Sequence, residues 1–228
     1  MKRVLVLNGS PRRNGNTSHL AAAFMKGSLE AAAETQEVLV RELNLKYCTG
    51  CLRCNILRRC SLRDDNWAEV SERIMASDVL VIASPVYFHH VTAPMKILID
   101  RFRSFVKVQI TETGLLHTPH NVWNKDFVLI LPMGSSDASD AQPVIDLFQY
   151  MTKILGSGNR LHVITGKRLA MVNQVTLPAE ELATLYSRLE LPVHLAEADA
   201  LKNHVLLENC FQLGKTLGKD GNSACARS

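Results

Sequence analysis

The sequence lacks the long apolar and basic segments that mark two large classes of protein. Its 228 residues contain no apolar run of about 18 residues, so we expect no membrane-spanning helix. The basic residues are scattered and the formal net charge is only +4, which does not suggest nucleic-acid binding. The apolar run at residues 4–7 is too short for a signal peptide, and we therefore predict a cytoplasmic location.

Several motifs of well-known enzymes are also missing. There is no G-x-x-x-x-G-K-[ST] loop for nucleoside triphosphates, no G-x-G-x-x-G dinucleotide fingerprint, no G-x-S-x-G elbow and no H-E-x-x-H zinc motif. No cysteine has an arginine six positions later, which excludes the C-x5-R loop of low-molecular-weight tyrosine phosphatases. The chemistry of the chain must therefore come from other segments.

The first such segment is the loop at residues 9–18, which reads GSPRRNGNTS. An apolar run precedes it and a helix-like run follows it. A strand that turns into a helix through glycine, serine and threonine directs backbone N–H groups at one point, which suits a phosphate. An ordinary helix N-cap is the alternative. The predicted phosphate ligands are Ser10, Arg12, Asn16, Thr17 and Ser18.

Five apolar segments alternate with helical ones, which predicts βαβ units and a doubly wound parallel sheet of α/β class. An alternating second strand favours the flavodoxin-like order 2-1-3-4-5, in which the loops at 9–18 and 84–90 must meet in space. We predict a domain over 1–190 with a cysteine-rich insertion at 47–63, then a C-terminal helix and mobile tail at 191–228. The predicted strands are 2–8, 37–43, 78–84, 126–131 and 159–165, and the predicted helices are 17–34, 64–76, 92–106, 143–155, 178–189 and 195–217.

The loop at residues 84–96 reads SPVYFHHVTAPMK and follows the third predicted strand. Its aromatic pair can form the wall of a site for a planar ring, or it can cap the sheet core. The G-S-P-R and N-T residues of the first loop, S-P-V-Y-F here, and K-x-x-x-D-R from Lys96 to Arg101 together resemble the NADPH-dependent FMN reductases over about the first 165 residues. That resemblance implies a bound FMN, and it assigns the ring to Pro85, Val86, Tyr87 and Phe88.

Two further features concern the same predicted flavin site. Met133 and Gly134, after the fourth predicted strand, are expected to complete the flavin cleft because of their place in the fold. His89 and His90 stand where the family often has a small or polar residue. They are interpreted either as proton donors over the flavin or as solvent-facing residues.

Four of the six cysteines lie within thirteen residues, as C-x2-C-x2-C-x5-C. Such clustering favours metal or redox chemistry over a disulfide framework. An iron–sulfur cluster, a zinc ion, and free thiols or a reversible disulfide are the alternatives. The segment resembles that of the iron–sulfur flavoproteins, which implies a [4Fe–4S] cluster that passes electrons to FMN. The ligands would be Cys48, Cys51, Cys54 and Cys60.

The resulting hypothesis is an FMN-dependent oxidoreductase in which the flavin carries the chemistry and no side chain is catalytic. NAD(P)H or ferredoxin would exchange electrons with a small-molecule acceptor. The alternatives are a cluster-free NAD(P)H-dependent FMN, quinone, nitro or azo reductase, and a non-enzymatic flavin electron carrier. The family resemblance further implies a homodimer or homotetramer.

Overall fold

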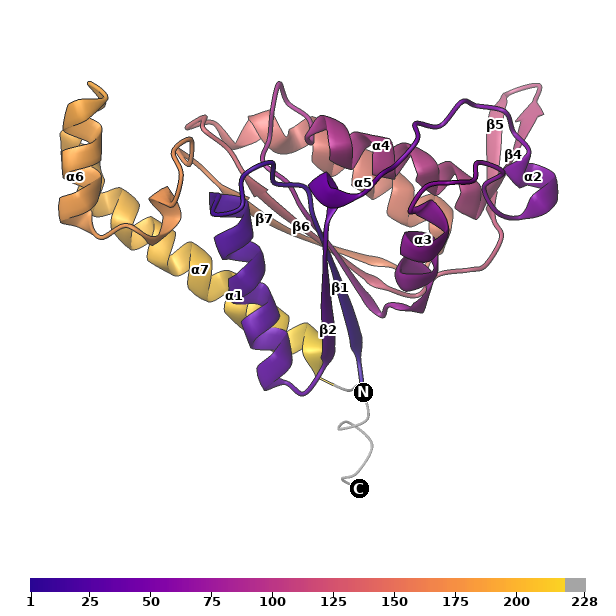
Figure 1. Ribbon diagram of the computed structural model, residues 1–228, viewed down its shortest axis with the longest axis horizontal. Helices are drawn as coiled ribbons and strands as arrows, with labels where there is room; N and C mark the ends of the chain where they lie inside the picture. The colour runs from indigo at the N-terminus through magenta and orange to yellow at the C-terminus, as the bar shows by residue number, and fades with distance from the viewer. Residues whose placement is uncertain (220–228) are drawn as a thin grey trace.

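Five parallel strands form the central sheet of the computed structural model, which describes residues 1–219 (Figure 1). Their order is β2-β1-β3-β6-β7, so the predicted flavodoxin-like order is confirmed. The strands are β1 Arg3–Asn8, β2 Glu34–Leu39, β3 Val79–Ala83, β6 Asp126–Pro132 and β7 Arg160–Gly166. The predicted second strand was placed about three residues too late, because the polar start of β2 at this sheet edge lacks an apolar pattern.

Helices cover both faces of the sheet, and no helix within residues 1–219 is long and apolar enough to cross a membrane. The tail predicted to be mobile lies, from residue 220 onward, outside the described residues. The α-helices are α1 Asn16–Glu30, α2 Cys54–Leu57, α3 Trp67–Ala76, α4 Ala93–Arg101, α5 Gln142–Leu155, α6 Ala179–Arg188 and α7 Ala196–Gly218. The short 3-10 helices are η1 Val40–Glu42, η2 Phe102–Phe105, η3 Ala138–Ala141, η4 Gln174–Thr176 and η5 Val193–Leu195.

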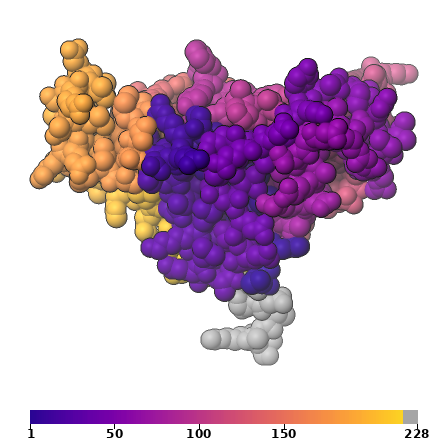
Figure 2. Space-filling view, viewed as in Figure 1, coloured from indigo at the N-terminus to yellow at the C-terminus, as the bar shows by residue number. Residues whose placement is uncertain are grey.

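A two-stranded antiparallel hairpin, β4 Val106–Thr111 and β5 Gly114–Pro119, was not predicted. We expected a helix as far as residue 106 and then a loop. In β4 apolar and polar residues alternate, which is the pattern of a strand, but the preceding helical segment obscured it. The hairpin projects beside α2 at one end of the molecule and α6 lies at the other (Figures 1 and 2).

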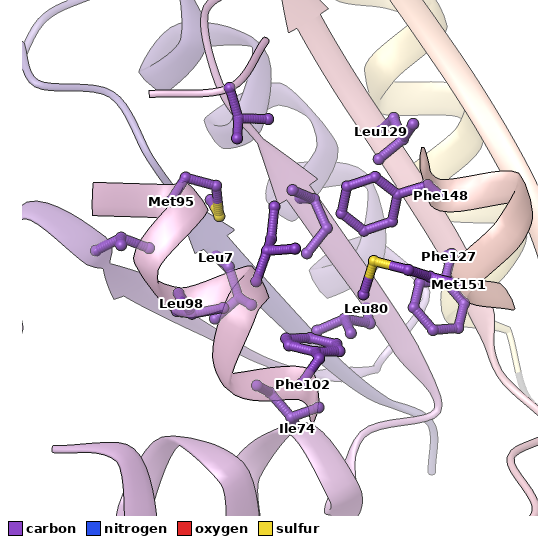
Figure 3. Close-up of a cluster of buried hydrophobic side chains, with 14 of the residues drawn as sticks. Leu7, Ile74, Leu80, Met95, Leu98, Phe102, Phe127, Leu129, Phe148 and Met151 are labelled. Carbon is purple, nitrogen blue, oxygen red and sulfur yellow. The ribbon is translucent and has the colours of Figure 1, made fainter. Parts of the chain in front are cut away.

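The hydrophobic core has two halves because the central strands are apolar on both faces. On one face α3, α4 and α5 pack against the sheet, and Figure 3 shows Ile74, Met95, Leu98 and Phe148 of these helices in one cluster with the strand residues Leu7, Leu80 and Leu129. On the other face α1 and α7 cover the sheet. The strand residues of that second half include Val4, Val6, Val79, Val81, Val128 and Ile130.

Helices α1 and α7 cross with their backbones in contact at two glycines. A Cβ atom on Gly27 would lie 2.0 Å from the carbonyl oxygen of Phe211, and one on Gly214 would lie 2.0 Å from that of Phe24. No real Cβ atom tolerates such a distance to a backbone atom. The helix that follows the loop at 9–18 is therefore positioned by the C-terminal helix.

Replacing Gly214 by alanine is expected to lower the free energy of unfolding by about 2 kcal/mol, because overpacking a close contact costs more than the helix propensity gained. Urea unfolding measures this difference. Asn209→Ala, at an exposed position of the same helix, is the matched control and should leave stability unchanged or slightly higher. A Gly214→Ala protein as stable as the wild type would show that the two helices can separate without cost.

Candidate functional site

A cavity of about 350 Å³ opens at the carboxyl ends of β1, β3 and β6, where the ligand of a doubly wound sheet is expected. The loops at 9–18 and 84–90 meet there, as the sequence predicts. The Thr92 hydroxyl donates to the Gly9 carbonyl oxygen at 2.8 Å, and the Val86 N–H donates to the Pro132 carbonyl at 3.0 Å. These bonds join the three loops. The lining residues are Ser10, Arg12, Gly15, Asn16, Thr17, Pro85, Val86, Tyr87, Phe88, Pro132, Met133, Gly134, Leu169 and Ala170.

One end of this cavity has the donors that a phosphate needs. Within residues 1–219 the backbone N–H groups of Asn16 and Thr17, in the first turn of α1, donate to no acceptor, and the Thr17 hydroxyl has no partner either. The positive end of the helix dipole adds to their field. A Cβ on Gly15 would lie 2.9 Å from the Ser10 hydroxyl oxygen, so this glycine keeps the turn open. The end of the cavity thus fits the phosphate of a mononucleotide.

Two of the predicted phosphate ligands are engaged elsewhere through their side chains. The Asn16 amide donates to the carbonyl oxygens of Leu169 and Met171, at 3.1 and 2.7 Å, and accepts from the Val175 N–H at 2.9 Å. Its backbone N–H alone is free for a ligand. The Ser10 hydroxyl donates to the Arg12 carbonyl at 2.9 Å. Asn16 therefore holds the loop at 169–175 against the cavity.

Arg12 and Ser18 differ in their relation to the cavity. Arg12 lines it and donates from Nη1 to the Ala170 carbonyl at 2.9 Å, so its cation lies at the rim. Ser18 does not line this cavity. It faces the neighbouring depression near β2, where its hydroxyl accepts from the Asn8 amide at 3.2 Å. The role assigned to Ser18 stays a prediction.

The loop after β3 forms the opposite wall and ends in a tight two-residue turn. Tyr87 and His90 exchange backbone hydrogen bonds of 2.8 and 3.0 Å, and the two residues between them have positive φ, 48° at Phe88 and 60° at His89. Glycine or asparagine normally occupies such positions. The Phe88 side chain is fully exposed at the cavity edge, so the pair does not cap the sheet core.

The third loop closes the cavity with its backbone. The Met133 N–H donates to the Gly166 carbonyl at 2.7 Å, and the Leu169 N–H donates to the Met133 carbonyl at 2.8 Å. A Cβ on Gly134 would lie 3.3 Å from the Ala170 Cβ. Leu169 and Ala170 were not predicted as lining residues, because no motif marks the segment after β7. Only the fold brings it to the cavity.

The four clustered cysteines surround a second, much smaller hollow of about 20 Å³. Arg103 donates from Nη1 to the buried Cys54 sulfur at 3.5 Å, and Ser61 lies 3.5 Å from the exposed Cys51 sulfur. Burial raises the pKa of the Cys54 thiol, whereas the Ser61 hydrogen bond lowers that of Cys51. Four thiols have the donor chemistry of the ligand set of an iron–sulfur cluster. In the arrangement described for residues 1–219, no three of the His, Cys, Asp and Glu side chains converge to hold a metal ion.

A buried ion pair anchors the cysteine-rich segment to α4. The side chains of Asp65 and Arg101 are 1% and 0% exposed, and Arg101 Nη1 donates both to an Asp65 oxygen and, at 2.6 Å, to the Lys46 carbonyl. Burial raises the pKa of Asp65, but hydrogen bonds from Arg101 and from the Lys46 and Trp67 N–H groups outweigh it and hold that pKa below its ordinary value. Lys46 precedes the segment and Asp65 follows it, so this arrangement fixes both of its ends.

Comparison with known sequences finds a family model that matches most of the chain and individual relatives that match less than half of it. The family model for NADPH-dependent FMN reductases matches residues 2–173. An iron–sulfur flavoprotein of Archaeoglobus fulgidus is 41% identical over 101 residues, which are 44% of this chain and 45% of that protein. An iron–sulfur flavoprotein of Methanocaldococcus jannaschii is 34% identical over 101 residues, 44% of this chain and 52% of that one. The chain thus matches about half the length of these curated relatives.

Comparison with solved structures supports the fold. The NAD(P)H:quinone oxidoreductase of Methanothermobacter marburgensis superposes with a TM-score of 0.62 over 95% of this chain and 98% of that one, at 14% identity. Identity this low shows a shared fold only. The family match, in contrast, covers three quarters of the chain and includes both loops whose motifs suggested it. The chain therefore belongs to the family of NADPH-dependent FMN reductases.

Proposed function

We propose that the chain binds FMN in the 350 Å³ cavity and uses it as an NAD(P)H-dependent oxidoreductase. One observation carries the proposal. The same cavity has free hydrogen-bond donors at the start of α1 and a wall with aromatic side chains at residues 85–88. A mononucleotide flavin has a phosphate and a planar ring that match these two ends. Membership of the FMN reductase family supports the same reading.

The residues of the chain bind and orient in this proposal, and FMN, when bound, supplies the electron-transfer chemistry. The first turn of α1 and Thr17 would hold the phosphate, and Arg12 would add a cation at the rim. Pro85, Val86 and Tyr87 would shield one side of the ring from water. Met133 and Gly134 would close the cavity from the loop after β6.

We further propose that the four clustered cysteines hold a [4Fe–4S] cluster, with Arg103 beside Cys54 as a source of positive charge. The names of the partly matching relatives, iron–sulfur flavoproteins, support this. A cluster would make one-electron exchange with a protein such as ferredoxin possible. The small-molecule acceptor, the dimeric or tetrameric state, the domain division and the cytoplasmic location stay predictions.

Anaerobic purification followed by a visible spectrum tests the flavin proposal. We expect bound FMN that is bleached by NADPH or NADH and recovers when an acceptor such as a quinone is added. FMN that only a partner protein reduces would point to an electron carrier. A chain that binds no FMN would contradict the proposal.

Cys51→Ser tests the cluster proposal separately. The Cys51 side chain is exposed, so the fold should persist, and we expect the variant to lose most of its iron and acid-labile sulfide while it retains FMN. Iron, sulfide and flavin assays on the same sample measure this. Cys210→Ala, a buried cysteine outside the segment, is the control and should keep both cofactors. A wild-type protein that contains FMN but no iron would contradict the cluster proposal and support the alternative of a cluster-free reductase.

A further inference from the structure

The chain between β7 and η4 forms one wall of the cavity proposed for FMN, and we name its residues 168–173 the wall segment. Leu169 and Ala170 of this segment line the cavity. Arg168 and Asn173, at its two ends, have φ of 56° and 59°, a region that residues other than glycine rarely adopt. Such conformations persist only where surrounding contacts hold them, and they are frequent at ligand sites. The contacts that hold the wall segment therefore affect the shape of the cavity.

Asp199, on α7, lies outside the cavity and binds the start of the wall segment. Its side chain is 1% exposed and accepts hydrogen bonds from both Nε and Nη2 of Arg168. Lys202 Nζ donates to the same carboxylate at 2.7 Å and to the Lys167 carbonyl at 3.0 Å. Burial raises the pKa of Asp199, but the hydrogen bonds to its oxygens, above all those from Arg168 and Lys202, hold that pKa far below its ordinary value. One ionised carboxylate thus fixes the chain at residues 167–168.

A series of buried hydrogen bonds leads from the same carboxylate to the middle of the wall segment. The Tyr186 hydroxyl, on α6, donates to Asp199 at 2.8 Å, and its oxygen accepts from Gln174 Nε2 at 3.0 Å. Gln174 Oε1 in turn accepts from the Met171 N–H at 3.1 Å. Tyr186 and Gln174 are 2% and 3% exposed, so water has little access to these bonds. The position of Asp199 therefore determines that of Met171 as well.

The wall segment is also bonded to the loops that line the cavity. The Arg168 N–H donates to the Ser135 carbonyl at 2.9 Å, and the Leu169 N–H donates to the Met133 carbonyl. The Asn16 amide, at the start of α1, donates to the Leu169 carbonyl. The wall segment thus joins the loop after β6 to the proposed phosphate end of the cavity, and the buried carboxylate supports it without lining the cavity itself.

We propose that Asp199 is a positioning residue that keeps the wall segment in the conformation that binds FMN. It acts through Arg168 at one point and through Tyr186 and Gln174 at another. The inference rests on the proposed function, because it takes FMN as the ligand of the cavity. If loss of the carboxylate leaves the binding conformation in about one tenth of the molecules, the apparent Kd for FMN rises about tenfold.

Asp199→Asn keeps the size of the side chain and removes its charge. We expect it to raise the Kd for FMN at least about tenfold, measured by quenching of flavin fluorescence on protein stripped of cofactor. Amide hydrogen exchange of the same protein without FMN gives a second readout. The N–H groups of Arg168, Leu169 and Met171 are hydrogen-bonded in the structure, and they should exchange at least about tenfold faster in the variant.

Ile74→Ala is the matched control. Ile74 lies in the core on the opposite face of the sheet from α7, so the change lowers the free energy of unfolding without touching the wall segment. It should leave both the Kd for FMN and the exchange of the wall segment unchanged. Equal changes in Ile74→Ala and Asp199→Asn would overturn the proposal, because they would reflect a general loss of stability.

Two further variants test how Asp199 acts. Arg168→Gln should raise the Kd for FMN as Asp199→Asn does, and the double variant should bind no more weakly than either single one, because residues that act as a unit are not additive. Tyr186→Phe removes one hydroxyl, should fold even if Asp199→Asn does not, and is expected to raise the Kd about threefold. Wild-type affinity in both Asp199→Asn and Tyr186→Phe, or additive effects of Asp199→Asn and Arg168→Gln, would contradict the positioning role and leave the proposed function intact. A wild-type protein that binds no FMN would instead contradict the proposed function.

Discussion

Replacing Thr17 by aspartate is expected to weaken FMN binding at least about 100-fold. The new carboxylate would lie in the first turn of α1, among the N–H groups proposed to bind the phosphate, and would compete for them. Two unit charges about 4 Å apart repel by roughly 4 kcal/mol at an effective dielectric constant of 20. Flavin fluorescence quenching, titrated on protein stripped of cofactor, measures the affinity.

The fold should survive this change, because an acidic residue in the first turn of a helix is favourable. Riboflavin provides the matched ligand: it lacks the phosphate, so its affinity should change by only a few-fold. Thr17→Ser keeps the hydroxyl and should bind FMN nearly as the wild type does. If Thr17→Asp weakened both flavins equally, or neither, the phosphate would not lie at the start of α1.

Replacing Asp65 by alanine is expected to cost about 3 kcal/mol of unfolding free energy. The change would leave the Arg101 guanidinium buried without its carboxylate, and removing one member of a buried pair costs several kcal/mol. Urea unfolding is the measurement. Glu69→Gln, which breaks the exposed Arg73–Glu69 pair on α3, should cost no more than about 0.5 kcal/mol.

Two further results would establish the cause of that loss. The double variant Asp65→Ala with Arg101→Met should recover part of the stability, because it removes the unpaired charge. The pKa of Asp65 is lower in the folded protein than its ordinary value of 3.8. The contribution of this carboxylate to the free energy of unfolding is therefore fully present above pH 3.8, and it is lost as the pH falls through the pKa of the folded protein. The deficit of Asp65→Ala should therefore shrink in acid. A deficit that is independent of pH and persists in the double variant would indicate lost packing.

The parallel sheet could be predicted because its strands are short apolar runs that alternate with helical segments. The meeting of the loops at 9–18 and 84–90 followed from the strand order alone, since these loops leave neighbouring strands at the same edge. Local patterns also predicted α7, whose bounds of Ala196–Gly218 differ from the expected 195–217 by one residue at each end.

The features that could not be predicted depend on contacts between distant segments. The sequence predicts that Asn16 caps the helix or binds a phosphate. In the structure its side-chain amide forms hydrogen bonds to the loop at 169–175, about 155 residues away. In the sequence Arg101 is marked only as the end of the K-x-x-x-D-R segment, and no pattern identifies Asp65, 36 residues earlier, as its buried partner. Sequence patterns describe neighbours within a few residues, and both of these roles are set by tertiary packing.

The helix α4 joins the surroundings of the two proposed redox sites. At its start the Thr92 hydroxyl is bonded to Gly9 of the first loop, and at its end Arg101 is bonded to Lys46 and Asp65. Its nine residues span about 14 Å, and one inserted residue would turn Arg101 by about 100° about the helix axis. The number of residues in α4 therefore sets the spacing between the cavity proposed for FMN and the cysteine hollow. A change in the length of a neighbouring loop would leave this spacing intact, whereas a change in the length of α4 would alter it.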